Sequence, residues 1–189
     1  MSELKFVDTD ELKKDDKELS KEIKEDRLAL DDAHIKKFCK NNDLAYHCVE
    51  LNKLDNNIFD IAYVYTGDKR NESNNGNVHH WLLVVGNHLF DSYGKTTKDN
   101  SYKLPENIKL FEQKPNQLQS YGTTVCGPYC CLLHKYVKEN PNIPENEYAQ
   151  SFINAFSLTK DTKQNDKIIL EEFKENGGNS GKSDEKASE

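Results

Sequence analysis

The apolar residues of this chain change their spacing at Cys126, from the alternation typical of strands to the period of a helix. Asn140-Pro141 marks the end of that helix, because the residue before a proline disfavours helical conformation. Pro128 fits the first turn, where its missing backbone N–H removes no intrahelical hydrogen bond. One apolar face consists of Cys130, Leu133 and Val137. The pattern therefore predicts a helix that begins close to Cys126.

Segments rich in β-branched and aromatic residues precede this helix and predict strands. The predicted strands cover 44–51, 58–65, 80–85, 88–91 and 108–111. Gly86-Asn87 separates the third strand from the fourth, and such a pair is typical of a two-residue hairpin turn. Because the strands are short and follow one another closely, we expect a small, mostly antiparallel sheet.

Helices are predicted on both sides of the strands along the sequence. Asp31 or Asp32 can cap an early helix that ends near Asn41-Asn42. Its apolar face consists of Ile35 and Phe38. Two late helices are predicted over 148–156 and 166–173. Helices that flank a small sheet predict an α+β fold.

Charge is concentrated at the two ends of the 189-residue chain. Residues 1–30 and 171–189 each carry −3, so 31–170 accounts for −1 of the total net charge of −7. We expect a charged N-terminal arm over 1–28, either flexible or a marginal amphipathic helix, one domain over 29–175, and a disordered polar tail over 176–189. The near-neutral domain does not indicate nucleic-acid binding, although a local lysine cluster stays open.

The composition also favours an intracellular protein. No apolar run approaches the roughly 20 residues that a membrane-spanning helix needs, and the first residues are not those of a secretory signal. Five cysteines, two of them adjacent, favour free thiols in a reducing compartment over a disulfide framework. Asn71-Glu72-Ser73 matches a glycosylation acceptor, but we interpret it as part of a polar loop over 66–77.

Cys126 and His80 are the residues best suited to nucleophilic chemistry. A thiol attacks as its thiolate, which a helix N-terminus and an imidazolium both favour. Gly127-Pro128 opens the helix and is expected to leave room for a substrate close to the sulfur. Asp91, at the end of the next predicted strand, can accept the Nδ1–H of His80 and orient the ring. Trp81 can shield the imidazole from water.

Gln119 can donate a side-chain N–H to an oxyanion, with the backbone N–H of Cys126 as the second donor. Each of the four residues has an ordinary alternative: a buried thiol, a structural histidine, a solvated turn carboxylate or an exposed loop glutamine. Their order and spacing together favour the catalytic interpretation. A buried thiol is our interpretation of Cys39, Cys48, Cys130 and Cys131. Paired metal-ligand spacings and phosphate-binding loops are missing from the sequence, so we expect neither a metal nor another cofactor.

The chain resembles adenain, the maturation protease of adenoviruses, and the related proteases of Polinton-like elements and of virophages such as mavirus. The resemblance covers about 31–173 and rests on four motifs: His80-Trp81, Phe90-Asp91-Ser-Tyr-Gly94, Gln-x6-Cys-Gly over 119–127 and Cys130-Cys131. It implies a papain-like, adenain-like cysteine protease fold with the nucleophile at a helix N-terminus. By the same resemblance, His80, Asp91 and Cys126 form a triad and Gln119 helps to build the oxyanion hole.

Two departures from that family bear on activation. The hairpin that joins His80 and Asp91 is shorter than we expect for adenain. Ile108 stands where adenain has the cysteine that links to its peptide activator, so no covalent activator is expected. Because 31–170 is also nearly neutral, any activating peptide or nucleic acid is expected to bind noncovalently and weakly, or to be unnecessary.

The resemblance implies a cysteine endopeptidase that cleaves capsid or other virion precursor proteins during particle maturation, in the virion and the host-cell virus factory. Proteases of ubiquitin- and SUMO-like proteins share the order His, Asp, Cys, and deconjugation is therefore the alternative function. Acyl transfer of the YopJ type is a third. An inactive binding module is disfavoured because all four catalytic positions are filled.

Overall fold

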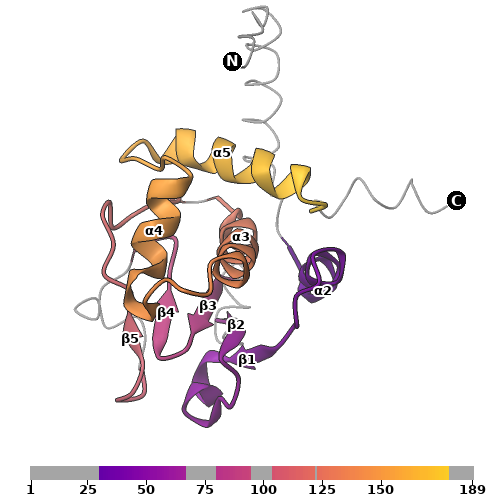
Figure 1. The fold of residues 1–189 in the computed structure, drawn as a ribbon, viewed down its shortest axis with the longest axis vertical. Helices are drawn as coiled ribbons and strands as arrows, with labels where there is room; N and C mark the ends of the chain where they lie inside the picture. The colour runs from indigo at the N-terminus through magenta and orange to yellow at the C-terminus, as the bar shows by residue number, and fades with distance from the viewer. Residues whose placement is uncertain (1–29, 67–79, 95–103, 122, 179–189) are drawn as a thin grey trace, which may run out of the picture.

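A five-stranded sheet in the order β1-β2-β3-β4-β5 carries the helices of this α+β fold (Figure 1). The computed structural model describes residues 30–66, 80–94, 104–121 and 123–178. The strands are β1 (Cys48–Glu50), β2 (Ile61–Tyr65), β3 (Trp81–Val85), β4 (His88–Phe90) and β5 (Lys109–Leu110). The α-helices are α2 (Asp32–Asn41), α3 (Cys126–Glu139), α4 (Tyr148–Ala155) and α5 (Thr162–Glu175), and the 3₁₀ helices are η1 (Leu51–Asn56) and η4 (Glu145–Glu147).

The sheet is mixed, which corrects the prediction of a mostly antiparallel one. Strands β2, β3 and β4 are antiparallel, whereas β1 runs parallel to β2 and β5 runs parallel to β4. A parallel pair needs a connection that carries the chain back to its starting edge. The chain joins β1 to β2 through 51–60 and β4 to β5 through 91–108, and the Gly86-Asn87 turn forms the predicted hairpin between β3 and β4.

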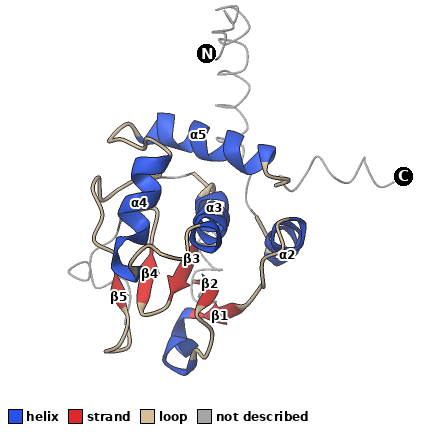
Figure 2. Cartoon of the chain, in the orientation of Figure 1, coloured by secondary structure: helices blue, strands red, loops and turns tan. Residues whose placement is uncertain are grey.

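The sheet is buried on both faces. Helices α2, α3, α4 and α5 lie on one side, while η1 lies on the other (Figure 2). Successive residues of β3 alternate between the two cores, because side chains of a strand point to opposite faces. The core under the helices takes Trp81, Leu83 and Val85, and the smaller one takes Leu82 and Val84.

Local signals in the sequence account for the start of helix α2 and for the turn between β3 and β4. Asp31 caps α2 by accepting a hydrogen bond from the backbone N–H of His34 at 2.9 Å, as predicted from the acidic pair there. Gly86 has a φ of +60°, which a glycine adopts without steric cost, and this turn joins β3 to β4 as predicted. The first predicted strand, 44–51, is shorter than expected: residues 44–47 lie outside β1, and the chain coils into η1 from Leu51 onwards.

The ordered domain extends past its predicted end at residue 175. Asn176 caps the end of α5, and its carbonyl accepts a hydrogen bond from Nδ2 of Asn42 at 2.9 Å. Gly178 is buried. Asn176–Gly178 therefore belong to the domain and not to the predicted tail. The arm over 1–28, the loop from 67 onwards with its glycosylation motif, and the tail from 179 lie outside the described residues. None of the helices in the described ranges has the length and apolar character needed to cross a bilayer.

Candidate active site

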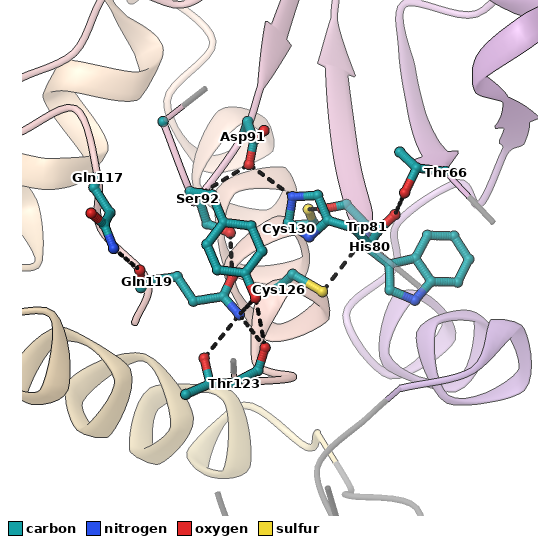
Figure 3. Close-up of polar contacts among 12 residues, drawn as sticks. Thr66, His80, Trp81, Asp91, Ser92, Gln117, Gln119, Thr123, Cys126 and Cys130 are labelled. Atoms are coloured by element: carbon teal, nitrogen blue, oxygen red, sulfur yellow. Dashed lines mark hydrogen bonds and ion pairs between the residues drawn. The ribbon is translucent and has the colours of Figure 1, made fainter. Parts of the chain in front are cut away.

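Cys126 is the first residue of α3, and 3% of its surface is exposed. The backbone of Trp81, at the start of β3, contacts two sulfurs of this helix. Its N–H donates to Sγ of Cys126 at 3.4 Å, and its carbonyl accepts from Sγ of Cys130 at 3.4 Å. Because residues one turn apart lie on the same helical face, both contacts fix the N-terminus of α3 against β3 (Figure 3).

His80 comes directly before β3 and Asp91 directly after β4, so the hairpin brings the two side chains together. Nε2 of His80 donates to Oδ1 of Asp91 at 2.8 Å, and both residues are buried. The expected bond from Nδ1 is therefore wrong. Asp91 and Cys126 lie on different sides of the ring (Figure 3), so the nitrogen left for the thiol is Nδ1.

The turn Asp91–Gly94 holds the carboxylate in place. The backbone N–H of Tyr93 donates to Oδ1 of Asp91 at 2.8 Å, and the N–H of Gly94 donates to the carbonyl of Asp91 at 2.9 Å. Gly94 has a φ of +67°, and a Cβ there would lie 2.0 Å from the carbonyl oxygen of Asn116. Both the backbone conformation and the close approach therefore require glycine at this position.

Two opposing effects set the charge of His80. Burial penalises the imidazolium, while hydrogen bonds to Asp91 and Cys126 favour it, and together they raise the pKa of His80 to about 9. The ring is therefore protonated at neutral pH. The charged ring lies next to Cys126, at the N-terminal end of α3.

Gln119 lies at the same site, but its side-chain amide is already engaged (Figure 3). Oε1 accepts a hydrogen bond from the hydroxyl of Ser92 at 2.6 Å, and Nε2 donates to the carbonyl of Thr123 at 2.9 Å and to its hydroxyl at 3.0 Å. The orientation of the amide is unambiguous because a carbonyl can only accept. To serve an oxyanion, the N–H of Gln119 must exchange Thr123 for the substrate oxygen.

The segment that carries Gln119 is held by α5, a support that the sequence analysis missed. Oδ2 of Asp166 accepts from the backbone N–H of Ser120 at 3.2 Å, and Nδ2 of Asn165 donates to the carbonyl of Leu118 at 3.1 Å. Both side chains are buried. The signal that could have found them is a pair of polar residues at the position where the apolar face of α5 begins.

The ring stacked on His80 belongs to Tyr93 and not, as expected, to Trp81. The centroids of His80 and Tyr93 lie 4.6 Å apart with 29° between the planes. Trp81 instead packs against Tyr65, and its indole N–H donates to the carbonyl of Leu30 at 2.9 Å. In Figure 3 the Trp81 ring therefore points away from the imidazole of His80.

Gly127 does not leave room for a substrate beside it, contrary to the expectation from the sequence. A Cβ on Gly127 would lie 2.8 Å from Cδ1 of Leu30, so the space beside it is filled by the chain that enters the domain. The glycine therefore allows close packing between Leu30 and the first turn of α3.

A second cysteine and histidine meet in the core and provide a contrast. Sγ of Cys39 lies 3.8 Å from Nδ1 of His134, which is 2.9 Å from the hydroxyl of Tyr63. Burial, with smaller contributions from Lys138 and His47, lowers the pKa of His134 to about 4, and burial raises the pKa of Cys39. Both groups are therefore neutral at neutral pH, in contrast to the charged ring of His80.

The other cysteines differ in their exposure to solvent. Cys39, Cys130 and Cys131 are buried as predicted, whereas Cys48 is exposed on β1 at the edge of the sheet. Within the described ranges, no group of three His, Cys, Asp or Glu side chains could hold a metal ion.

Ile108 lies away from the candidate site, in the smaller core on the other face of the sheet. Its side chain is buried there.

No protein-family model matches the chain, and no curated protein matches it. The case for a function therefore depends on the geometry of these side chains and on the motifs that bring them together.

Proposed function

We propose that this protein is a cysteine endopeptidase with His80, Asp91 and Cys126 as its catalytic residues. The observation that supports this most strongly is the position of His80, which is hydrogen bonded to Asp91 at 2.8 Å and to Cys126 through its other nitrogen. A buried imidazolium between a carboxylate and a thiol at a helix N-terminus suits thiol-based acyl transfer.

In the proposed reaction, the thiolate of Cys126 attacks the carbonyl carbon of the scissile peptide bond, and the carbonyl electron pair moves to oxygen. Backbone N–H groups at the start of α3, and the amide of Gln119 once it leaves Thr123, stabilise that oxyanion. As the C–N bond breaks, His80 gives its proton to the departing amine and a thioester remains. Neutral His80 then takes a proton from water, which hydrolyses the thioester and restores Cys126.

We further propose capsid or other virion precursor proteins as substrates, cleaved in the virion or the host-cell virus factory. This step rests on the adenain-like motifs over 80–94 and 119–131. Deconjugation of a ubiquitin- or SUMO-like protein would use the same three residues, and so would acyl transfer. Substrate class is therefore the property that separates these functions.

The test compares the full chain with its Cys126→Ala variant on two kinds of substrate. The proposal expects the wild type to cut a co-expressed capsid precursor at internal or tail sites and the variant to leave it intact. Probes that carry an electrophile at the C-terminus of ubiquitin or SUMO should react slowly. Rapid probe reaction without capsid cleavage would favour deconjugation, and cleavage by Cys126→Ala would reject the assigned nucleophile.

A further inference from the structure

Tyr93 contacts the imidazole of His80 through its ring. The stacking distance of 4.6 Å between centroids places the phenol ring over one face of the imidazole. Tyr93 is itself half-buried and hydrogen bonded through its hydroxyl, whereas Tyr121, which stacks on it with 5.5 Å between centroids, is exposed and has no ring contact with His80 among those described. The imidazole is therefore held in a narrow range of orientations, because tilting it would require the Tyr93 ring to move.

Tyr93 also contacts the partner of His80 through its backbone. Its N–H donates to Oδ1 of Asp91, the oxygen that accepts from Nε2 of His80. A carboxylate oxygen that accepts two hydrogen bonds has less freedom to rotate. The ring and backbone of Tyr93 thus act on the two members of one hydrogen-bonded pair.

The hydroxyl of Tyr93 reaches the segment that carries the proposed oxyanion donor. It donates to the carbonyl of Thr123 at 2.8 Å and lies 3.3 Å from Nε2 of Gln119. The same Thr123 carbonyl accepts from Gln119 at 2.9 Å. Tyr93 therefore bridges the His80–Asp91 pair and the 119–123 segment on the other side of Cys126.

We infer that Tyr93 is a positioning residue that couples His80 to the Gln119–Thr123 contact. This inference rests on the proposed function and adds a part to its machinery. The ring keeps His80 aligned between Asp91 and Cys126, and the hydroxyl holds the Thr123 carbonyl. When Gln119 turns to a substrate oxygen, the hydroxyl of Tyr93 remains to satisfy the carbonyl that Gln119 leaves.

Two substitutions separate the two roles of the side chain. Tyr93→Phe keeps the ring and removes the hydroxyl, so it should lower kcat about tenfold, the size expected for one hydrogen bond that acts in the transition state, with KM nearly unchanged. Tyr93→Leu removes the ring, so it should also weaken the pairing of His80 with Cys126. Tyr121→Leu, on the exposed side of the same stack, is the matched control.

The rate at which iodoacetamide alkylates Cys126, measured across pH 5–10, reports the pairing without any substrate. Wild type, Tyr93→Phe and Tyr121→Leu should share one profile, with rapid alkylation at neutral pH. In Tyr93→Leu the rate at neutral pH should fall about tenfold or more and approach that of an ordinary thiol, which rises with pH. Thermal unfolding establishes that each variant is folded.

The outcomes distinguish failure of this inference from failure of the proposed function. A wild-type alkylation profile in Tyr93→Leu would overturn the positioning role of the ring, and an unchanged kcat in Tyr93→Phe would overturn that of the hydroxyl. If the wild type cuts no protein substrate but its alkylation profile depends on Tyr93 as described, the endopeptidase proposal fails while the positioning role stands.

Discussion

Nε2 of His80 and Oδ1 of Asp91 lie 2.8 Å apart, and both side chains are buried. A carboxylate that close to a buried imidazole stabilises its charged form more than bulk water would. Burial alone would lower the pKa of His80, but its contacts with Asp91 and Cys126 raise that pKa from 6.5 to about 9. In the proposed reaction, this charged ring is the acid that protonates the leaving amine at neutral pH.

The raised pKa of His80 predicts where the pH profile of kcat/KM falls at high pH, which is its alkaline limb. Above pH 9 the ring loses the proton that the leaving amine needs, so kcat/KM should fall as pH rises through about 9. Asp91→Asn removes the negative charge, so the alkaline limb should move to lower pH and kcat should fall roughly 10–100-fold. Peptide cleavage followed across pH 6–10 checks both effects. An alkaline limb that stays in place in Asp91→Asn would contradict the role of this carboxylate.

The same shift links His80 to stability. A histidine whose pKa is higher in the folded protein stabilises the fold fully below its unfolded value of 6.5, and that contribution is lost as pH rises through about 9. The pH range in which the fold gains from His80 therefore includes neutral pH, where the proposed reaction also needs the charged ring.

Cys126 should be the most reactive thiol of the folded protein. Its competitor is Cys48, which is exposed but whose pKa is raised, chiefly by desolvation. Limited iodoacetamide at pH 7 should modify Cys126 before Cys48, as peptide mass spectrometry can show. Cys48→Ser is the control, since it removes the accessible alternative and should leave the labelling rate of Cys126 unchanged. Faster labelling of Cys48 or Cys39 would reject Cys126 as the activated thiol.

Much of the site could be predicted because its residues lie at the ends of elements with clear local signals. The hairpin about Gly86-Asn87 places His80 beside Asp91, and the change of period at Cys126 places the thiol at the start of α3. These are short-range features, set by turn geometry and by the apolar pattern. Local sequence signals therefore predict the pairing of His80 with Asp91 and the position of Cys126 at the start of a helix.

The features that could not be predicted depend on contacts between distant segments. The parallel pairing of β5 with β4 is formed by a connection whose path no local pattern specifies. The engagement of Gln119 by Thr123, and the stacking of Tyr93 on His80, depend on how loops fold back over the site.

The amide of Gln119 has a role that a substitution can test. If it turns from Thr123 to the oxyanion, Gln119→Ala should lower kcat roughly 10²–10³-fold, as loss of one oxyanion donor does elsewhere, with little change in KM. Gln117→Ala is a matched control, because Gln117 donates to the backbone carbonyl of Gln119 at 2.9 Å and has no contact with Thr123 among those described. An unchanged kcat in Gln119→Ala would restrict Gln119 to a structural role.

Asp166 lies at the junction of α3, α5 and the segment that carries Gln119. Its carboxylate accepts from the backbone N–H of Ser120 at 3.2 Å and from the hydroxyl of Tyr129 at 2.9 Å. Burial raises the pKa of Asp166 to about 6, and these hydrogen bonds oppose the shift only in part. At neutral pH the buried carboxylate of Asp166 is therefore ionised, and its ionisation lowers the free energy of unfolding.

The effect of Asp166 on the free energy of unfolding depends on pH in one direction. Between 3.8 and about 6 the folded protein holds the proton of Asp166 more tightly than the unfolded chain does, so this group makes the free energy of unfolding fall as pH rises through that window. Asp166→Asn removes the effect. The unfolding free energy of the variant, relative to wild type, should therefore increase by about 3 kcal/mol from below pH 4 to above pH 6.

Urea unfolding monitored by circular dichroism at pH 4, 5, 6 and 7 measures this difference. Glu171→Gln, which removes a carboxylate from an exposed position of the same helix, is the matched control. Parallel curves for wild type and Asp166→Asn would contradict the raised pKa. Since an asparagine can still accept from Ser120, Asp166→Asn should keep the Gln119 segment in place and retain cleavage activity. The ionisation of Asp166 would then affect stability alone, while its hydrogen bond to Ser120 serves the site.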